Sequence, residues 1–322
     1  MILVNRGLIY LIISFLILGC SKKQNTYVIK GFTQGTTYTI KYHNNKPIKG
    51  ANIDSLLNIV DMSMSTYNMN SCISLLNNGY DILLDSLIEK VITRSIEICN
   101  ETNGMFDITV APIVNDWGFG PDKLRKKKSS YSNYILGCDK IILKNKKLIK
   151  SDSVMIDLNG IAQGFTSDFI ANYFFSEEGV QDFMIEIGGE VHCRGNNLGK
   201  GWKIGVDSPS NKKSDFSFIL NLNNISLATS GSYRNYYYLD SVKINHTINP
   251  KTLEPTSNKL ISSTILFHDC ISADAYATAC MALGLEDSKV FLQENSIVGC
   301  LIYIENGDTL SYMSPGFSSF LH

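Results

Sequence analysis

The sequence of 322 residues lacks several features that mark other classes of protein. Lys and Arg total 29 and Asp and Glu total 30, so the chain has no basic excess of the kind that binding to nucleic acid requires. No two cysteines are spaced as Cys-x-x-Cys, which argues against a zinc site. No apolar run reaches the ~20 residues that span a bilayer. The remaining composition, 44% hydrophobic and 18% charged, is typical of a globular protein.

The N-terminus resembles the export signal of a bacterial lipoprotein. Arg6 precedes an apolar run over residues 8–18, which is the pattern of a secretory signal. Gly19 and Cys20 follow at once, and a small residue before a cysteine at this point resembles a lipobox. We therefore expect lipidation of Cys20. The alternatives are an ordinary signal peptide and an uncleaved anchor helix.

These expectations divide the chain into a signal peptide at 1–19, a linker at 20–26 that begins with the lipidated cysteine, and one domain at 27–322. Two or three acyl chains anchor a protein stably where one is marginal. The mature protein would then be a membrane-anchored lipoprotein on the periplasmic side of the cell envelope.

The other cysteines show no disulfide framework. Of the 8 cysteines, 7 remain after Cys20, and an odd number cannot all pair within one chain. We expect most of them to be small buried apolar residues. An oxidising compartment leaves one disulfide possible.

The hydrophobic pattern predicts an α+β fold. Apolar residues recur at helical spacing over 53–64 and 84–96, and alternation over 27–42 predicts two strands. Strands cluster in hairpins with helices between the clusters, unlike a regular βαβ alternation. The other expected elements are hairpins over 140–149 and 298–313, strands at 154–156, 183–187, 202–206, 216–222 and 225–228, and helices at 160–179, 272–283 and 287–295.

Two glycine-containing segments could bind a planar or phosphorylated ligand. Trp117, Gly118 and Phe119 place flat rings beside an approachable backbone, as a planar ring would need. The alternative is a tryptophan packed under a glycine-rich turn. Residues 156–164 run from a predicted strand through glycines into a helix, whose N-terminus favours phosphate. Asp157 at the strand end could accept hydrogen bonds from a ring or ribose, or could simply cap the helix.

Two further strand ends carry glycine and polar residues. Gly188 and Gly189 could present backbone amides to a ligand, as could the segment that contains Ser230. Arg234 is a candidate for binding an anionic group. The alternatives are tight strand exits and a surface ion pair.

The last candidates are a cation site and a base. Asp274 and Thr278 are four residues apart in a predicted helix, so their oxygens lie on one side. Such hard oxygen ligands suit Mg²⁺, although Asp274 could instead complement the helix dipole. His246, at a strand end, could be a general base, although a lone histidine is more often structural.

Taken in order, these segments resemble the ApbE family, which consists of FAD:protein FMN transferases that are often bacterial lipoproteins. The resemblance covers about residues 30–315. The segments that carry it are Ser65-Thr66-Tyr67, residues 104–112, residues 117–120, residues 157–164, residues 187–190, residues 229–233, residues 246–250 and residues 273–279.

The resemblance implies a T-fold-related α+β domain with mixed or antiparallel sheets and flanking helices. It implies that the protein binds FAD and Mg²⁺, and transfers FMN to a Ser or Thr hydroxyl of an acceptor protein with release of AMP. The acceptors carry a Ser/Thr-Gly-Ala-Thr motif and are typically subunits of membrane redox complexes. The implied residues are Asp274, Thr278 and the Gly160 carbonyl for the metal, Gln34, Tyr67, Trp117 to Phe119 and Asp157 for FAD, and His246 for catalysis.

The chain departs from the family pattern at two positions. Gln163 stands where the family commonly has Lys, which removes a positive charge near the phosphates. Asn249 stands where the family more often has Asp. Two other functions would need the same residues and remain alternatives to the transferase function. They are hydrolysis of FAD to FMN and AMP, and flavin binding without catalysis.

Overall fold

The centre of the molecule is one antiparallel sheet of eight strands. The computed structural model describes residues 24–121, 134–209, 216–233 and 235–322. The strand order is β1-β2-β5-β6-β9-β14-β15-β16. The strands are β1 (Asn25–Thr33), β2 (Thr36–Asn44), β5 (Asp182–Ile187), β6 (Glu190–Arg194), β9 (Ile225–Gly231), β14 (Leu260–Phe267), β15 (Val298–Glu305) and β16 (Asp308–Met313).

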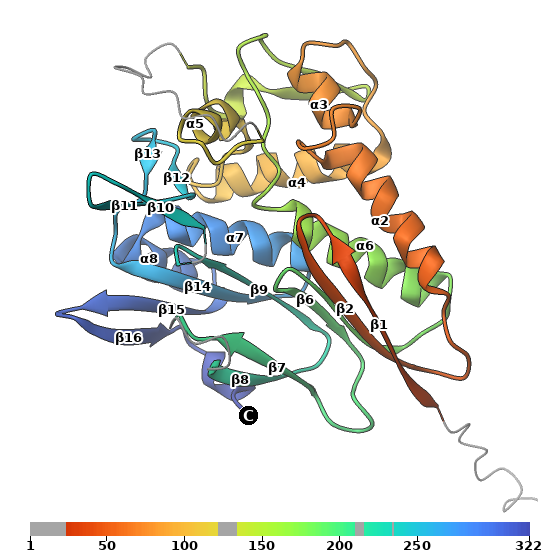
Figure 1. The fold of residues 1–322 in the computed structure, drawn as a ribbon. Helices are drawn as coiled ribbons and strands as arrows, with labels where there is room; N and C mark the ends of the chain where they lie inside the picture. Colours follow the sequence, from red (N-terminus) through yellow and green to blue (C-terminus); the bar gives the residue numbers. More distant parts are fainter. Residues whose placement is uncertain (1–23, 122–133, 210–215, 234) are drawn as a thin grey trace, which may run out of the picture.

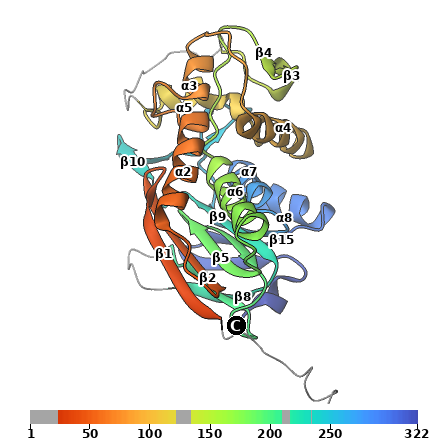
Figure 2. The ribbon, with the colours of Figure 1, turned by 90° about the vertical axis from the view of Figure 1, so that its right-hand side faces the viewer.

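Helices cover one face of this sheet and a hairpin covers part of the other (Figures 1 and 2). The helices are α2 (Gly50–Met64), α6 (Ala162–Ser176), α7 (Cys270–Leu283) and α8 (Leu285–Glu294). The hairpin is formed by β7 (Trp202–Asp207) and β8 (Phe216–Leu222), and its buried Trp202 and Leu220 belong to the apolar cluster that contains Val191 and Leu227 of the sheet.

The remaining elements gather at the end of the molecule beyond α7 (Figure 1). They include helices α3, α4 and α5 and the two-stranded sheets β3–β4, β10–β11 and β12–β13. Their bounds are α3 (Cys72–Asn77), α4 (Ser86–Glu101), η1 (Ile108–Val110), α5 (Ala111–Asp116), η2 (Cys138–Lys140), β3 (Ile142–Lys144), β4 (Lys147–Ile149), β10 (Tyr236–Leu239), β11 (Val242–Asn245), β12 (Ile248–Asn249) and β13 (Glu254–Pro255). The chain closes with η3 (Phe317–Phe320), near β8.

Helix α7 is buried on nearly all sides, between the sheet and the helices above it. Its small residues allow this close packing, and a helix buried all round needs no apolar stripe. Asp269 caps it by accepting a hydrogen bond from the Ser272 N–H at 2.8 Å. Asp168 of α6 accepts from the N–H groups of Cys270 and Ile271. The N-terminus of α7 is thereby fixed to α6.

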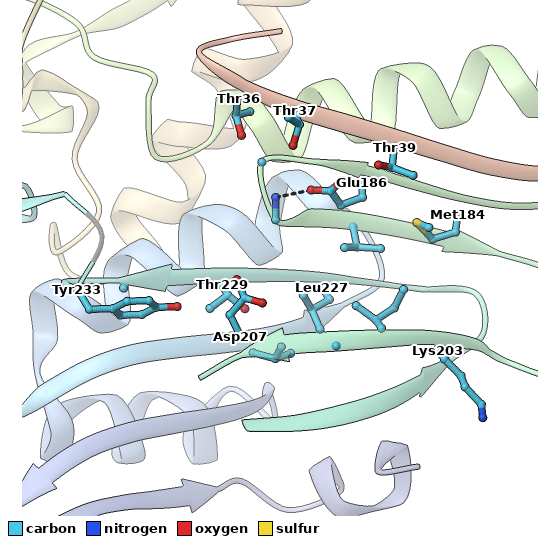
Figure 3. Close-up of a pocket in the computed structure, with 17 residues that line it drawn as sticks. Thr36, Thr37, Thr39, Met184, Glu186, Lys203, Asp207, Leu227, Thr229 and Tyr233 are labelled. Carbon is cyan, nitrogen blue, oxygen red and sulfur yellow. Dashed lines mark hydrogen bonds between the residues drawn. The ribbon is translucent and has the colours of Figure 1, made fainter. Parts of the chain in front are cut away.

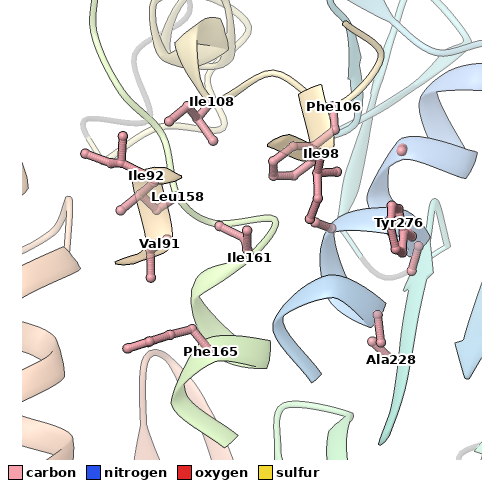
Figure 4. Packing of buried hydrophobic residues seen from close by; sticks show 14 of the residues in the cluster. Val91, Ile92, Ile98, Phe106, Ile108, Leu158, Ile161, Phe165, Ala228 and Tyr276 are labelled. Carbon is pink, nitrogen blue, oxygen red and sulfur yellow. The ribbon is translucent and has the colours of Figure 1, made fainter. Parts of the chain in front are cut away.

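The main core packs α4, α6 and α7 around the segment 154–161 (Figure 4). Ile156, Leu158 and Ile161 of that segment are fully or almost fully buried. They contribute to the same cluster as Ile92 and Phe165. Since each buried aliphatic side chain stabilises the fold by roughly 1.5–3 kcal/mol, the glycine-bearing segment is firmly held.

Most of the expected elements are confirmed, but the strand at 154–156 is wrong. The segment forms no strand, and its backbone bonds to the side chain of Asn77 in place of a neighbouring strand. Its Oδ1 accepts from the Ile156 N–H at 2.7 Å, and its Nδ2 donates to the Ile156 carbonyl at 2.8 Å. One side-chain amide thus satisfies both backbone groups, and no ladder forms.

Smaller differences concern boundaries and elements that the pattern did not predict. Strand β1 begins at Asn25, so residues 25–26 belong to the sheet and not to the linker. Strands β6 and β14 complete the large sheet, and helices α3 and α5 are further additions. Within the described ranges, no helix is long and apolar enough to cross a membrane. Residues 1–19 and Cys20 lie outside these ranges.

One pair of cysteines is bonded. Cys99 at the end of α4 forms a disulfide with Cys138 in η2, 39 residues along the chain. The free cysteines among the described residues are Cys72, Cys193, Cys270, Cys280 and Cys300, and all but Cys72 are buried.

Removal of this disulfide should destabilise the protein. Cross-linking residues this far apart restricts the unfolded chain, and such a bond typically contributes about 2–4 kcal/mol. We expect Cys138→Ser to lower the free energy of unfolding by about that amount in urea denaturation without reductant. Cys72→Ser, which breaks no bond, is the control. Equal unfolding midpoints for the Cys138 variant and the native protein would contradict the prediction.

Candidate active site

The site is built where α6 approaches α7. Gly164 in the first turn of α6 donates its N–H to Asp274 Oδ2 at 3.0 Å. A Cβ at Gly164 would lie 2.3 Å from the Cys270 carbonyl oxygen and 2.7 Å from the Asp274 Cβ. Only glycine permits this approach, which places a carboxylate at the N-terminus of α6.

One turn further along α7, the Thr278 hydroxyl lies close to β9 and to the loop before α6. Thr278 Oγ1 lies 3.1 Å from Ser230 Oγ of β9. A Cβ at Gly160, in the loop before α6, would lie 3.1 Å from the same Thr278 oxygen. The structure therefore brings Gly160, Ser230, Asp274 and Thr278 together, with the two α7 oxygens on one side as the spacing predicts.

The Asp274 carboxyl is buried, and burial raises its pKa to about 7. The Gly164 hydrogen bond opposes this effect. A buried carboxylate needs a compensating charge. Among the described residues, no three His, Cys, Asp or Glu side chains lie together so that they could hold a metal ion. The donor set here is thus one carboxylate, a hydroxyl and the Gly160 backbone, which suits Mg²⁺ because Mg²⁺ retains water and shares ligation with phosphates.

The predicted ring-binding residues lie at the end of α5. Gly118 has a φ of +81°, which lets the chain turn between Trp117 and Phe119. The Trp117 indole N–H donates to the Leu253 carbonyl at 3.4 Å. The Phe119 ring stacks on Tyr237 with centroids 5.3 Å apart. These aromatic residues therefore form a packed group whose geometry is fixed.

His246 stands beside this group, one residue after β11. Its ring lies edge to face with Phe119, at 6.3 Å between centroids. Its Nδ1 lies 3.1 Å from the Asn235 carbonyl oxygen, which can only accept, so Nδ1 carries the proton and Nε2 is the basic nitrogen. Burial lowers the pKa of His246. The ring is therefore neutral near pH 7 and able to accept a proton.

Tyr67 and Asp157 lie near one another, since the pKa of Tyr67 is raised by burial and then by the charge of Asp157. The Tyr67 side chain is 60% exposed, which leaves its ring open to a ligand. Asp157 Oδ1 accepts from the Asn159 N–H at 2.8 Å, and burial raises its pKa. Its own N–H donates to the Ile108 carbonyl at 2.7 Å, so the residue is tied to the segment before α5.

The two remaining glycines border a cavity. Gly188 and Gly189 turn the chain between β5 and β6, and the Gly189 N–H donates to Glu186 at 3.0 Å. The cavity, of about 520 Å³, lies between the large sheet and the β7–β8 hairpin (Figure 3). This volume is in the range of small-molecule sites. Its walls include Thr36, Thr37, Thr39, Glu186, Gly188, Gly189, Lys203, Asp207, Thr229, Gly231 and Tyr233.

Gln34 occupies the β1–β2 turn near the same glycines. Its φ is +49°, and its Nε2 donates to Thr166 Oγ1 of α6 at 2.7 Å. Its Oε1 is buried without a hydrogen-bond partner in the described part of the chain. A buried oxygen without a hydrogen-bond partner is suited to accept a hydrogen bond from a ligand. Arg234, also predicted for this site, lies outside the described ranges.

Sequence reasoning did not single out the threonines of the cavity wall. Thr37 and Thr39 alternate with the buried residues Tyr38 and Ile40, so they line the opposite face of β2. The alternation of threonine with apolar residues in β2 could have predicted that these threonines share one face of the strand. That this face borders a cavity depends on the β7–β8 hairpin, which is distant in sequence.

The comparisons with known proteins agree with this geometry. The model of the ApbE family matches residues 34–302. The chain belongs to the ApbE family. The FAD:protein FMN transferase of Vibrio cholerae is 32% identical over 321 residues, covering 95% of this chain and 96% of that protein. The enzyme of the same name from Haemophilus influenzae is 32% identical, with coverages of 94% and 93%.

Solved structures of the family share the fold. The flavin transferase ApbE from Vibrio cholerae has a TM-score of 0.82 at 31% identity, covering 92% of this chain and all of that one. The flavinyl transferase ApbE from Pseudomonas stutzeri, in its apo form, has a TM-score of 0.83 at 25% identity, covering 94% and 98%. The expected ApbE-like α+β fold is confirmed, and the family identifies the chain as a transferase enzyme.

In the absence of a bound cation, Asp274 should make folding stability depend on pH. Its folded-state pKa of about 7 lies above the ordinary value of 3.8, so the folded chain holds this proton longer than the unfolded chain. Stability therefore falls as pH rises from about 4 towards 7. We expect Asp274→Asn to reduce this fall in urea unfolding with a chelator present, because the amide does not titrate. An unchanged pH slope in the variant would contradict the assignment; Asp287→Asn, on the surface of α8, is the control.

Proposed function

We propose that this protein is a Mg²⁺-dependent FAD:protein FMN transferase. It transfers FMN from FAD to a Ser or Thr hydroxyl of an acceptor protein and releases AMP. The observation that carries the proposal is the meeting of Asp274, Thr278 and Gly160 at the N-terminus of α6. The shared name of the curated relatives supports the same activity.

The metal would be held by the Asp274 carboxylate, the Thr278 hydroxyl and the Gly160 carbonyl. Bound there, Mg²⁺ would neutralise charge on the pyrophosphate and improve AMP as a leaving group. Backbone N–H groups at the start of α6 favour the phosphates of FAD in the same place. Ser230, which lies 3.1 Å from Thr278, would hold that hydroxyl in position.

His246 would serve as the general base. Its Nε2 takes the proton of the acceptor hydroxyl, whose oxygen then attacks the FMN phosphorus. The new phosphoester bond forms as the bond between that phosphorus and the AMP phosphate breaks. The carbonyl of Asn235 fixes the tautomer that this step needs.

The flavin would lie among Tyr67, Trp117 to Phe119 and Asp157. The exposed ring of Tyr67 offers a flat surface, and the α5 end offers a fixed aromatic group. Gly188 and Gly189 line the cavity, and Gln34 lies in the β1–β2 turn, two residues before the cavity residue Thr36. The rest of FAD would contact these three residues, and Arg234 would bind one of its anionic groups.

The protein would act at the membrane. Cleavage before Cys20 and acylation of that cysteine would tether the domain, through the linker that follows, to the periplasmic side of a membrane. An acceptor that is a subunit of a membrane redox complex would lie in the same layer. Tethering then raises the effective concentration of the two proteins.

The central test combines the purified protein with FAD, MgCl₂ and a small carrier protein bearing an exposed Thr-Gly-Ala-Thr segment. Native protein should leave fluorescent flavin on the carrier in a denaturing gel and release an equal amount of AMP. Asp274→Ala should lower the rate by about 100-fold or more, since changes even around metal ligands cost roughly 10–100-fold. Asp287→Ala should have no effect. AMP with free FMN would indicate hydrolysis, and the absence of both labelled carrier and AMP would overturn both enzyme functions.

The pH dependence of transfer tests His246 separately. Because burial lowers the pKa of His246 below the ordinary 6.5, transfer should decline at acid pH with a midpoint below 6.5. Removal of a general base typically costs ~10²–10⁴-fold, so His246→Ala should lose activity to that extent and lose the acid limb. The variant should still bind FAD, as measured by quenching of flavin fluorescence. An acid midpoint above 6.5, or a fully active variant, would be incompatible with the assignment.

A further inference from the structure

The hairpin that precedes His246 is separate from the large sheet. Strands β10 and β11 pair only with each other, and no strand in the described ranges pairs with either outer edge. They are joined by Asp240 and Ser241, which have φ values of +47° and +67° and so turn the chain tightly. Proteins usually protect such open edges with charge, proline or a covering element.

The two faces of this hairpin differ. On the inner face, the Tyr237 hydroxyl donates to the Trp117 carbonyl at 2.9 Å, and its ring stacks on Phe119. Alternation places Tyr236, Tyr238, Lys243 and Asn245 on the other face, because Tyr236 pairs with Asn245 and Tyr238 with Lys243 in the register.

The exposed part of this outer face, which consists of Tyr236, Tyr238 and Lys243, is open to solvent, whereas Asn245 at its end is buried. The two tyrosine rings lie edge to face at 5.7 Å. The Lys243 ammonium lies 4.3 Å from the centroid of the Tyr236 ring. Tyr236 is 40% exposed and Tyr238 is 65% exposed. Tyrosine gives a large contact area at low cost in side-chain entropy, which is why it is enriched at protein interfaces.

The hairpin also holds the proposed base. Both the backbone N–H and the Nδ1 of His246 donate to the carbonyl of Asn235, the residue just before β10. Two hydrogen bonds therefore link the start of the hairpin to His246. A protein chain that brings a hydroxyl to His246 Nε2 must pass close to this hairpin.

We propose that the outer face of β10–β11 docks the extended acceptor segment that carries the target hydroxyl. The proposal rests on the proposed transferase function. Tyr237 on the inner face contacts the aromatic group assigned to flavin, whereas the two exposed rings and the ammonium of the outer face contact, in the described part of the chain, no other segment that would compete with the second substrate. Lys243 is a positive charge on that face, so the segment it fits has an acidic side chain near the target residue, with apolar groups against the tyrosines.

Contacts of this kind should act on acceptor affinity alone. The tyrosines lie outside the metal site and do not contact the reacting groups, so they stabilise bound acceptor and transition state equally. Such uniform binding lowers KM without changing kcat. Loss of one should therefore raise the KM for the acceptor and leave the affinity for FAD unchanged.

The experiment measures kcat and KM for the carrier protein, together with FAD affinity, in native protein and in Tyr238→Ala. Tyr80→Ala is the matched control, because Tyr80 is 61% exposed and lies between α3 and α4. Truncating an interface tyrosine commonly costs enough binding energy to raise KM by about tenfold. We expect that rise for Tyr238→Ala, with kcat within about twofold, and no change for Tyr80→Ala.

A second variant tests the charge without removing a ring. With an aspartate placed next to the Thr-Gly-Ala-Thr segment of the carrier, Lys243→Glu should raise KM strongly at low salt and less at high salt. With a neutral residue in that place, the effect should be smaller.

The outcomes separate the two proposals. If native protein transfers FMN but Tyr238→Ala keeps the native KM, the docking surface is wrong and the transferase function stands. If FAD affinity falls while the KM for the carrier is unchanged, the face belongs to the flavin site and the docking proposal is overturned. If native protein transfers nothing, both proposals fail.

Discussion

The contact between α6 and α7 at Gly164 determines the arrangement of the active site. A side chain at this position would collide with the Cys270 carbonyl, so the two helices could not approach as they do. The approach places Asp274 on the Gly164 N–H and brings Thr278 against Gly160. Asp168 of α6 in turn caps α7, so each helix holds the start of the other. The site geometry is thus fixed by the close approach of the two backbones and by two carboxylates, Asp274 and Asp168, that each accept from the start of the other helix.

The proposed flavin side of the site depends on different constraints. It is assembled from segments at the far end of the molecule, where the Asp157 N–H bonds to Ile108 and the hairpin packs on Phe119. The disulfide of Cys99 ties the nearby η2 segment to α4. These segments have little regular secondary structure and lie outside the large sheet. Specific hydrogen bonds and one disulfide therefore hold them in place. A rigid side for the proposed metal site beside a less regular side for the proposed substrates is consistent with a transferase that would admit a protein.

The sequence allowed much of this to be predicted where local chemistry decides the structure. The helix after Asp85 has a side-chain cap and a clear apolar period, and it forms as expected. Strand β14 was not predicted, because Ser262, Ser263 and Thr264 are polar and yet fully buried by neighbouring strands and α7. The strand at 154–156 was predicted wrongly, because its partner is the Asn77 side chain, 79 residues away. In each case long-range packing overrode the local pattern.

Gln163, in place of the lysine that the family commonly has, affects the charge balance of the site. The raised pKa of Asp274 results from burial, opposed by the Gly164 hydrogen bond, and no positively charged side chain in the described part of the chain contributes to it. A lysine at position 163, as the family commonly has, would add positive charge near the phosphates, whereas the Gln163 amide adds none and lies beside Gly188. In the proposed site the ionised Asp274 carboxylate and the FAD pyrophosphate would both be anionic, so a cation between them would stabilise both. With one cationic side chain fewer, binding of Mg²⁺ and of FAD should be strongly interdependent, because each supplies the charge or the ligands that the other lacks.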